Sequence, residues 1–197
     1  MKVLKVILIV IVSIIALAAI AGMFMPSKFV MERSIVINAD QKVIFDQVNV
    51  IKNWEQWSPW MKMDPETKMT YDGPTEGVGA SYSWSGKKLG EGTLTISESN
   101  PYESITNEMD FKKDGKGVSG FRIAKAENGN SLTWWIEQEV GANPFKKLMM
   151  GVMGKSFMGN IFDQGLNDIK KIAEAMPPPA AEVIPAAPDT LTADTVR

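Results

Sequence analysis

The sequence predicts an α+β fold in which an antiparallel seven-stranded sheet curls around one long C-terminal helix, preceded by a transmembrane helix. A run of 20 residues without a charge, from Val6 to Met25, lies near the start of the chain. Residues 68–140 alternate apolar and polar side chains, and residues 143–176 show the i, i+3, i+4 spacing of an amphipathic helix. A sheet with one apolar face must be covered, and only the last helix is long enough to cover it.

The N-terminal segment, residues 1–28, has the length of a transmembrane anchor. Its uncharged run matches the ~30 Å hydrocarbon core of a bilayer at 1.5 Å per residue. A cleaved signal peptide is the main alternative, because small residues at 19–21 resemble a cleavage site, but secretory apolar regions are shorter. A helix buried in the core of the domain is the third interpretation of this segment. Lys2 and Lys5 precede the run, which favours an extracytoplasmic domain on a single-pass anchor.

Composition excludes several classes of function. The 197 residues include no cysteine and no histidine, so a thiolate nucleophile, an imidazole base and a zinc site built on these residues are excluded. The net charge of −2 gives no electrostatic footprint for nucleic acid. We expect no metal and no cofactor.

Local patterns define the elements of a domain over residues 29–176. We expect residues 34–38 to form a short β-branched strand, and Asn38 or Asp40 to cap an amphipathic helix over 40–52. Pro59 interrupts the aromatic segment that follows. Six strands joined mostly by short turns then predict an antiparallel meander. The last element forms one or two helical pieces, and the Pro- and Ala-rich residues 177–197 predict a disordered tail.

Several stretches in this order resemble the SRPBCC superfamily with its START and Bet v 1-like helix-grip fold, specifically the polyketide cyclase/dehydrase and lipid-transport-like branch. They are Glu32–Ala39, Trp54–Trp60, Gly90–Gly92, Leu132–Glu137, Asn143–Phe145 and Phe162–Lys170. The resemblance covers nearly all of 1–176. It implies a deep apolar cavity between sheet and helix, and it names no substrate and no catalytic set.

Large apolar side chains on the strands and the last helix are candidates to line such a cavity, although any of them could equally fill the core. A second group, at 54–60, could form the pocket mouth, pack in the core or contact the lipid interface. The lining candidates are Tyr71, Tyr82, Trp84, Met109, Phe111, Phe121, Trp134, Met158 and Phe162, and the mouth candidates are Trp54, Trp57 and Trp60.

The case for an enzyme rests on an inward carboxyl group or tyrosine. Candidates are Glu91, Asp110, Glu137 and Glu139, although strand parity places the last two on the solvent face, with Tyr71 and Tyr82 as alternatives. We expect a membrane-anchored domain that binds or carries a hydrophobic small molecule or lipid. A cyclase- or dehydratase-like enzyme and an interaction or stress-related module with a filled core are the alternatives.

Overall fold

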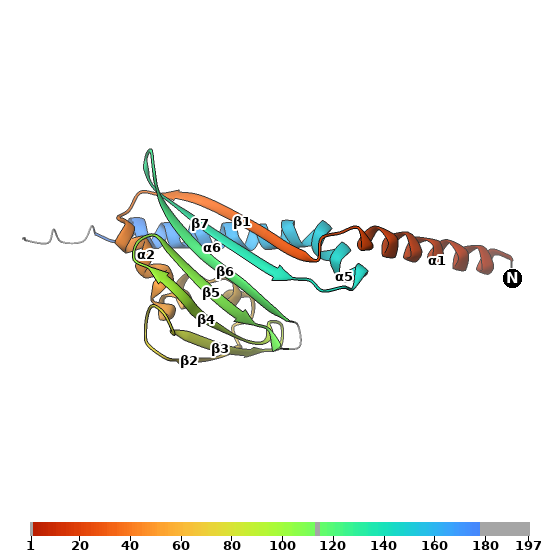
Figure 1. Cartoon of the computed structure of the whole chain (residues 1–197), viewed down its shortest axis with the longest axis horizontal. Helices are drawn as coiled ribbons and strands as arrows, with labels where there is room; N and C mark the ends of the chain where they lie inside the picture. Colours follow the sequence, from red (N-terminus) through yellow and green to blue (C-terminus); the bar gives the residue numbers. More distant parts are fainter. Residues whose placement is uncertain (1, 113–114, 178–197) are drawn as a thin grey trace, which may run out of the picture.

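The computed structural model describes residues 2–112 and 115–177. Figure 1 shows a curved sheet with helix α6 lying along one face and helix α1 projecting away from the domain. The tail predicted at 177–197 lies, from residue 178 onward, outside the described residues.

The predicted seven-stranded antiparallel sheet is confirmed, with strand order β1-β7-β6-β5-β4-β3-β2. The first strand is longer than residues 34–38, because it pairs with β7 from Lys28, opposite Glu139, to Ile37, opposite Asn130. Exposed charged residues interrupt the apolar pattern in its first half and hide it in the sequence. The strands are β1 (Lys28–Ile37), β2 (Lys68–Asp72), β3 (Ser81–Gly86), β4 (Gly90–Asn100), β5 (Ser104–Asp110), β6 (Lys116–Ala126) and β7 (Gly129–Glu139).

Short helices connect β1 to β2. Asp40 caps the first of them by accepting a hydrogen bond from the Lys42 amide at 2.8 Å. The helix predicted over 40–52 ends at Asn49, because Val50 is extended and forms a β-bridge with Glu76. The helices are α2 (Gln41–Asn49), the 3-10 turn η1 (Ile51–Asn53), α3 (Trp54–Trp57) and α4 (Pro59–Met63).

The C-terminal element has two α-helical pieces, α5 (Pro144–Met149) and α6 (Lys155–Ala175), joined by a π-helical turn, η3 (Met150–Gly154). The face of α6 that covers the sheet buries Phe162, Leu166 and Ile169. Gly165 permits the close approach, because a Cβ atom there would lie 2.7 Å from Cζ3 of Trp134.

Helix α1 (Lys2–Met23) is the helix among the described residues that is long and apolar enough to cross a membrane. Its 22 residues span about 33 Å at 1.5 Å each. Most of its side chains are exposed, but Gly22 in the last turn is buried, and a Cβ atom there would lie 2.0 Å from the carbonyl oxygen of Pro144. The last turn of α1 therefore meets the first turn of α5.

The strand register defines which end of the sheet lies nearest α1. Lys28 follows α1 closely and pairs with Glu139, while Gln138 pairs with Gly117 and Gly117 with Met109. This row crosses the sheet, and we refer to it as the α1 end of the sheet. The β6–β7 turn lies at the opposite end.

Candidate ligand cavity

A cavity of about 380 Å³ lies between the sheet, helices α3 and α4, and helix α6. Its volume falls within the roughly 300–1,000 Å³ of small-molecule pockets. Met109 and Gln138 place it toward the α1 end of the sheet. The lining residues are Trp54, Glu55, Ser58, Trp60, Met61, Asp64, Pro65, Thr67, Met69, Tyr82, Trp84, Leu89, Leu94, Met109, Phe111, Ser119, Trp134, Gln138 and Met158.

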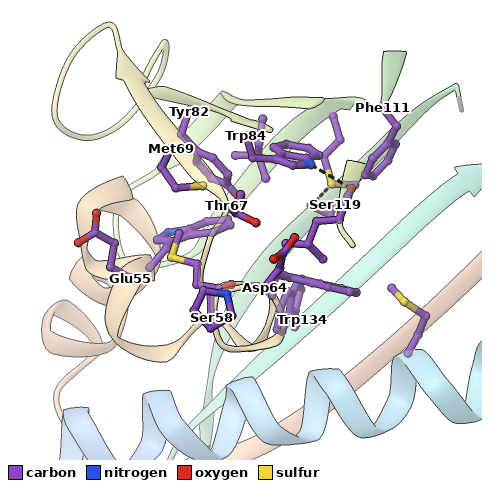
Figure 2. Close-up of a pocket in the computed structure, with 18 of the residues that line it drawn as sticks. Glu55, Ser58, Asp64, Thr67, Met69, Tyr82, Trp84, Phe111, Ser119 and Trp134 are labelled. Atoms are coloured by element: carbon purple, nitrogen blue, oxygen red, sulfur yellow. Dashed lines mark hydrogen bonds between the residues drawn. The ribbon is translucent and has the colours of Figure 1, made fainter. Parts of the chain in front are cut away.

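Aromatic rings form much of the wall. Tyr82 and Trp84 alternate with exposed serines on β3, so both face the helices, and their ring centroids lie 5.8 Å apart. Phe111 continues the wall with its centroid 5.8 Å from that of Trp84. Figure 2 shows these rings across the cavity from Trp134, which lies between the cavity and helix α6.

Gly92 makes room for the Trp84 ring. The two residues pair across β3 and β4, and a Cβ atom at Gly92 would lie 2.1 Å from Cζ2 of Trp84. The indole therefore lies flat over the glycine, and the Trp84 Nε1–H is 3.4 Å from the Leu89 carbonyl oxygen. A larger residue at position 92 must displace the ring.

Polar groups are few and include a buried carboxylate. Asp64, at the end of α4, is 5% exposed, and its Oδ2 accepts a hydrogen bond from the Lys88 amide at 2.9 Å. This hydrogen bond is the main reason that the pKa of Asp64 lies below its usual value, with burial opposing it. The buried Thr67 hydroxyl lies beside this carboxylate and also lowers its pKa. Asp64 is therefore ionised at neutral pH beside a buried hydroxyl group.

Glu55 forms the outer acidic edge of the cavity. It accepts hydrogen bonds from Lys52 at 2.7 Å and from the Tyr71 hydroxyl at 2.6 Å, and these two bonds lower its pKa. Burial and the Glu55 hydrogen bond raise the pKa of Tyr71, and burial alone raises that of Tyr82. Within the part of the chain that the structure describes, the side chains lining the cavity include two ionised carboxylates and no lysine or arginine.

The structure brings eight of the twelve candidate binding residues to the cavity. They are Tyr82, Trp84, Met109, Phe111, Trp134 and Met158 from the lining set and Trp54 and Trp60 from the mouth set.

Four of the candidates lie outside the cavity. Trp57, Phe121 and Phe162 are almost fully buried in the packed core, where the Trp57 and Phe121 rings meet edge to face at 5.9 Å. Tyr71 lies on edge strand β2 and packs against Tyr82, with its hydroxyl directed to Glu55. Neighbouring rings fill the space beside these four residues. The four residues therefore pack against the residues that line the cavity and do not reach the cavity themselves.

The sequence does not predict several of the lining residues, for two reasons. Asp64, Pro65 and Thr67 belong to a connection without periodicity, and no pattern predicts where such side chains point. Ser119 and Gln138 share strand parity with inward aromatic residues, so parity alone could have found them, although polar side chains are ordinarily expected on the solvent face.

The carboxyl groups proposed for an enzyme do not line the cavity. Glu137 forms an ion pair with Lys28 on the outer face of the sheet, as parity predicts. Glu91, Asp110 and Glu139 are also absent from the lining. Within residues 2–112 and 115–177, no group of three acidic residues is placed to hold a metal ion.

Comparison with known proteins identifies the family. The model for "Polyketide cyclase / dehydrase and lipid transport" matches residues 28–174, which include the whole sheet and nearly all of α6. The chain belongs to this family, and the resemblance to the SRPBCC superfamily is confirmed. A search of curated protein sequences gives no match.

Solved structures show the same fold at low identity. Protein CV1439 from Chromobacterium violaceum superposes with a TM-score of 0.55 at 14% identity, over 75% of this chain and 99% of its own. Protein SA2116 from Staphylococcus aureus gives 0.58 at 11%, over 75% and 94%. The di-domain ARO/CYC BexL from the BE-7585A biosynthetic pathway gives 0.53 at 15%, over 77% of this chain and 52% of BexL.

Proposed function

We propose that this protein binds an apolar small molecule, of lipid or lipid-like character, in the cavity between sheet and helix, and that α1 anchors it to a membrane. The observation that carries the proposal is the cavity of about 380 Å³ with its wall of Trp, Tyr, Phe and Met side chains. Protein interiors are otherwise close-packed, so a hollow of this size with an apolar lining is suited to an apolar occupant. The presence of this cavity also argues against the alternative of an interaction module with a filled core.

The charges around the cavity select the polar end of the ligand. Asp64 and Glu55 are hydrogen-bond acceptors, and among residues 2–112 and 115–177 no basic side chain lines the cavity to balance an anion. A carboxylate or phosphate placed there would face like charge in a site partly shielded from water. We therefore infer a ligand that ends in a hydrogen-bond donor, such as a hydroxyl group, near Asp64 and Thr67.

Binding without chemistry fits the site better than catalysis. A general acid at neutral pH needs a raised carboxyl pKa, whereas the pKa values of Asp64 and Glu55 are lowered. The raised pKa values of Tyr71 and Tyr82 keep both hydroxyl groups protonated, far from the range of a general base.

Native mass spectrometry with lipid extraction tests the proposal on the full chain, purified in mild detergent and offered a medium-chain alcohol. We expect one retained apolar molecule per chain in the wild type and in Glu108→Trp, whose side chain lies on the outer face of β5. Met109→Trp, one residue further on and inside the cavity, should lose it. A wild type without such a molecule, or a Met109→Trp variant that retains it, would overturn the proposal.

A further inference from the structure

The start of the C-terminal helical element carries a row of exposed apolar side chains, which we refer to as the α5–α6 patch. It consists of Phe145, Met149, Val152, Met153 and Phe157, which are 47–66% exposed. Their spacing follows the i, i+4, i+7, i+8 positions of one helix face, and the π turn η3 lies within the row. Contiguous exposed apolar side chains on a folded domain mark an interaction site.

The patch lies beside the end of α1. Gly22, in the last turn of α1, meets the backbone of Pro144, and Gly151 lies close to the Sδ atom of Met25. Figure 1 shows α5 at the junction between α1 and the domain. If the ~33 Å of α1 cross the ~30 Å hydrocarbon core, the last turn of α1 lies at the bilayer surface, and Phe145 lies at the same level.

The charges around the patch favour an anionic surface. Between Val140 and Phe162 the sequence contains Lys146, Lys147 and Lys155 and no acidic residue, although the whole chain has a net charge of −2. An apolar face flanked by lysines is the composition of helices that lie in the membrane interface and attract anionic headgroups.

We propose that the α5–α6 patch docks into the headgroup region of the bilayer beside α1, with its lysines contacting anionic lipids. This inference rests on the proposed membrane anchor but not on the cavity. Docking fixes the orientation of the domain as well as its distance from the membrane. Because the patch adjoins the end of α1, the α1 end of the sheet, toward which the cavity lies, then faces the lipid.

Site-specific labelling of the full chain tests the docking, because a cysteine-free sequence accepts single labels without other changes. An environment-sensitive fluorophore is placed at Val152→Cys, at Ser13→Cys within α1, or at Glu127→Cys in the β6–β7 turn. The protein is reconstituted in nanodiscs of phosphatidylcholine with a minor share of phosphatidylglycerol, with nitroxide lipids as shallow or deep quenchers.

We expect the Val152 label to emit at shorter wavelength and to lose most of its intensity to the shallow quencher, while the Glu127 label keeps its intensity. Lys146→Glu combined with Lys147→Glu should return the Val152 label to the emission of the Glu127 label, and Lys125→Glu should not. A quenched Ser13 label with an unquenched Val152 label would overturn the docking and leave the anchor intact. A disulfide that forms between unlabelled Val152→Cys chains on mild oxidation, together with an unquenched label at the same position, would assign the patch to a second copy instead.

An unquenched Ser13 label would overturn the anchor. Since the docking rests on the anchor, this result would overturn docking beside α1 as well, whatever the Val152 label reports. The labelling and the mass spectrometry therefore report on separate claims.

Discussion

Trp134 of β7 and Phe162 of α6 stack face to face, with ring centroids 4.0 Å apart and an angle of 5° between the ring planes. The pair joins the sheet to the helix that covers it, and Gly165, one turn further along α6, lets the helix approach. Trp134 also lines the cavity, so this contact holds one wall of the cavity in place. The stability of the fold and the shape of the cavity therefore both depend on the contact between these two residues.

Removing the Phe162 ring should destabilise the protein strongly. Phe162 is 1% exposed, and truncation of a buried phenylalanine typically costs about 3–5 kcal/mol. Phe157→Ala, on the same helix but 55% exposed, should change the free energy of unfolding by less than about 0.5 kcal/mol in detergent. Urea unfolding of both variants followed by circular dichroism checks this. Equal losses would mean that the Trp134–Phe162 contact does not hold α6 to the sheet.

Gly92→Ala should reshape the cavity from the sheet side. The new Cβ atom would overlap the Trp84 ring, and the ring must rotate toward the cavity. Overpacking of this kind typically costs about 1–3 kcal/mol, so we expect a folded protein with lower stability. Binding of a medium-chain alcohol should weaken by tenfold or more, whereas Ser83→Ala, on the outer face of β3, should bind like the wild type. Unchanged affinity in Gly92→Ala would show that Trp84 does not shape the ligand site.

Asp64 should make folding sensitive to acid. Its pKa in the folded protein lies below the value in the unfolded chain, about 3.9, so its contribution to stability is complete above that pH and is lost as the pH falls through the folded pKa. Asp64→Asn should therefore lose less stability than the wild type between neutral pH and pH values below about 4. Urea midpoints at several pH values measure this. Parallel pH profiles in the two proteins would contradict the hydrogen bond from Lys88.

The carboxylates at the cavity predict a preference between two ligands of equal chain length. A medium-chain alcohol should bind at least about tenfold more tightly than the corresponding fatty acid, because a hydrogen bond to a charged group contributes about 1.5–3 kcal/mol and the acid faces like charge. Asp64→Asn should reduce the difference in affinity between the alcohol and the fatty acid. Isothermal titration calorimetry provides both affinities, and tighter binding of the acid would refute the inferred polar end.

Much of the fold could be predicted from the sequence because the buried face of a strand or helix produces a periodic pattern of apolar residues. The alternation around Tyr82 and Trp84 shows which side of β3 faces the helix, and the spacing of Phe162 and Leu166 shows which side of α6 faces the sheet. Periodicity does not show whether an inward side chain meets another side chain or a hollow. Phe121 and Trp84 have the same inward parity, yet only Trp84 reaches the cavity.

Other parts of the site show no periodic pattern of apolar residues in the sequence. Asp64 and Thr67 reach the cavity from the connection between α4 and β2, whose path depends on contacts distant in sequence, such as the Lys88 amide. The contact between Gly22 and Pro144 likewise joins segments more than a hundred residues apart, so the position of the α5–α6 patch beside α1 could only be seen in the structure.

Fluorine NMR of the full chain carrying fluorotryptophan tests occupation of the cavity most directly. Trp54, Trp60, Trp84 and Trp134 line the cavity, while Trp135 lies on the outer face of the sheet over Gly120. On titration with a medium-chain alcohol, we predict saturable shifts of the four cavity resonances and an unchanged Trp135 resonance. If the four cavity resonances stay in place, or if Trp135 moves instead, the cavity is not the binding site.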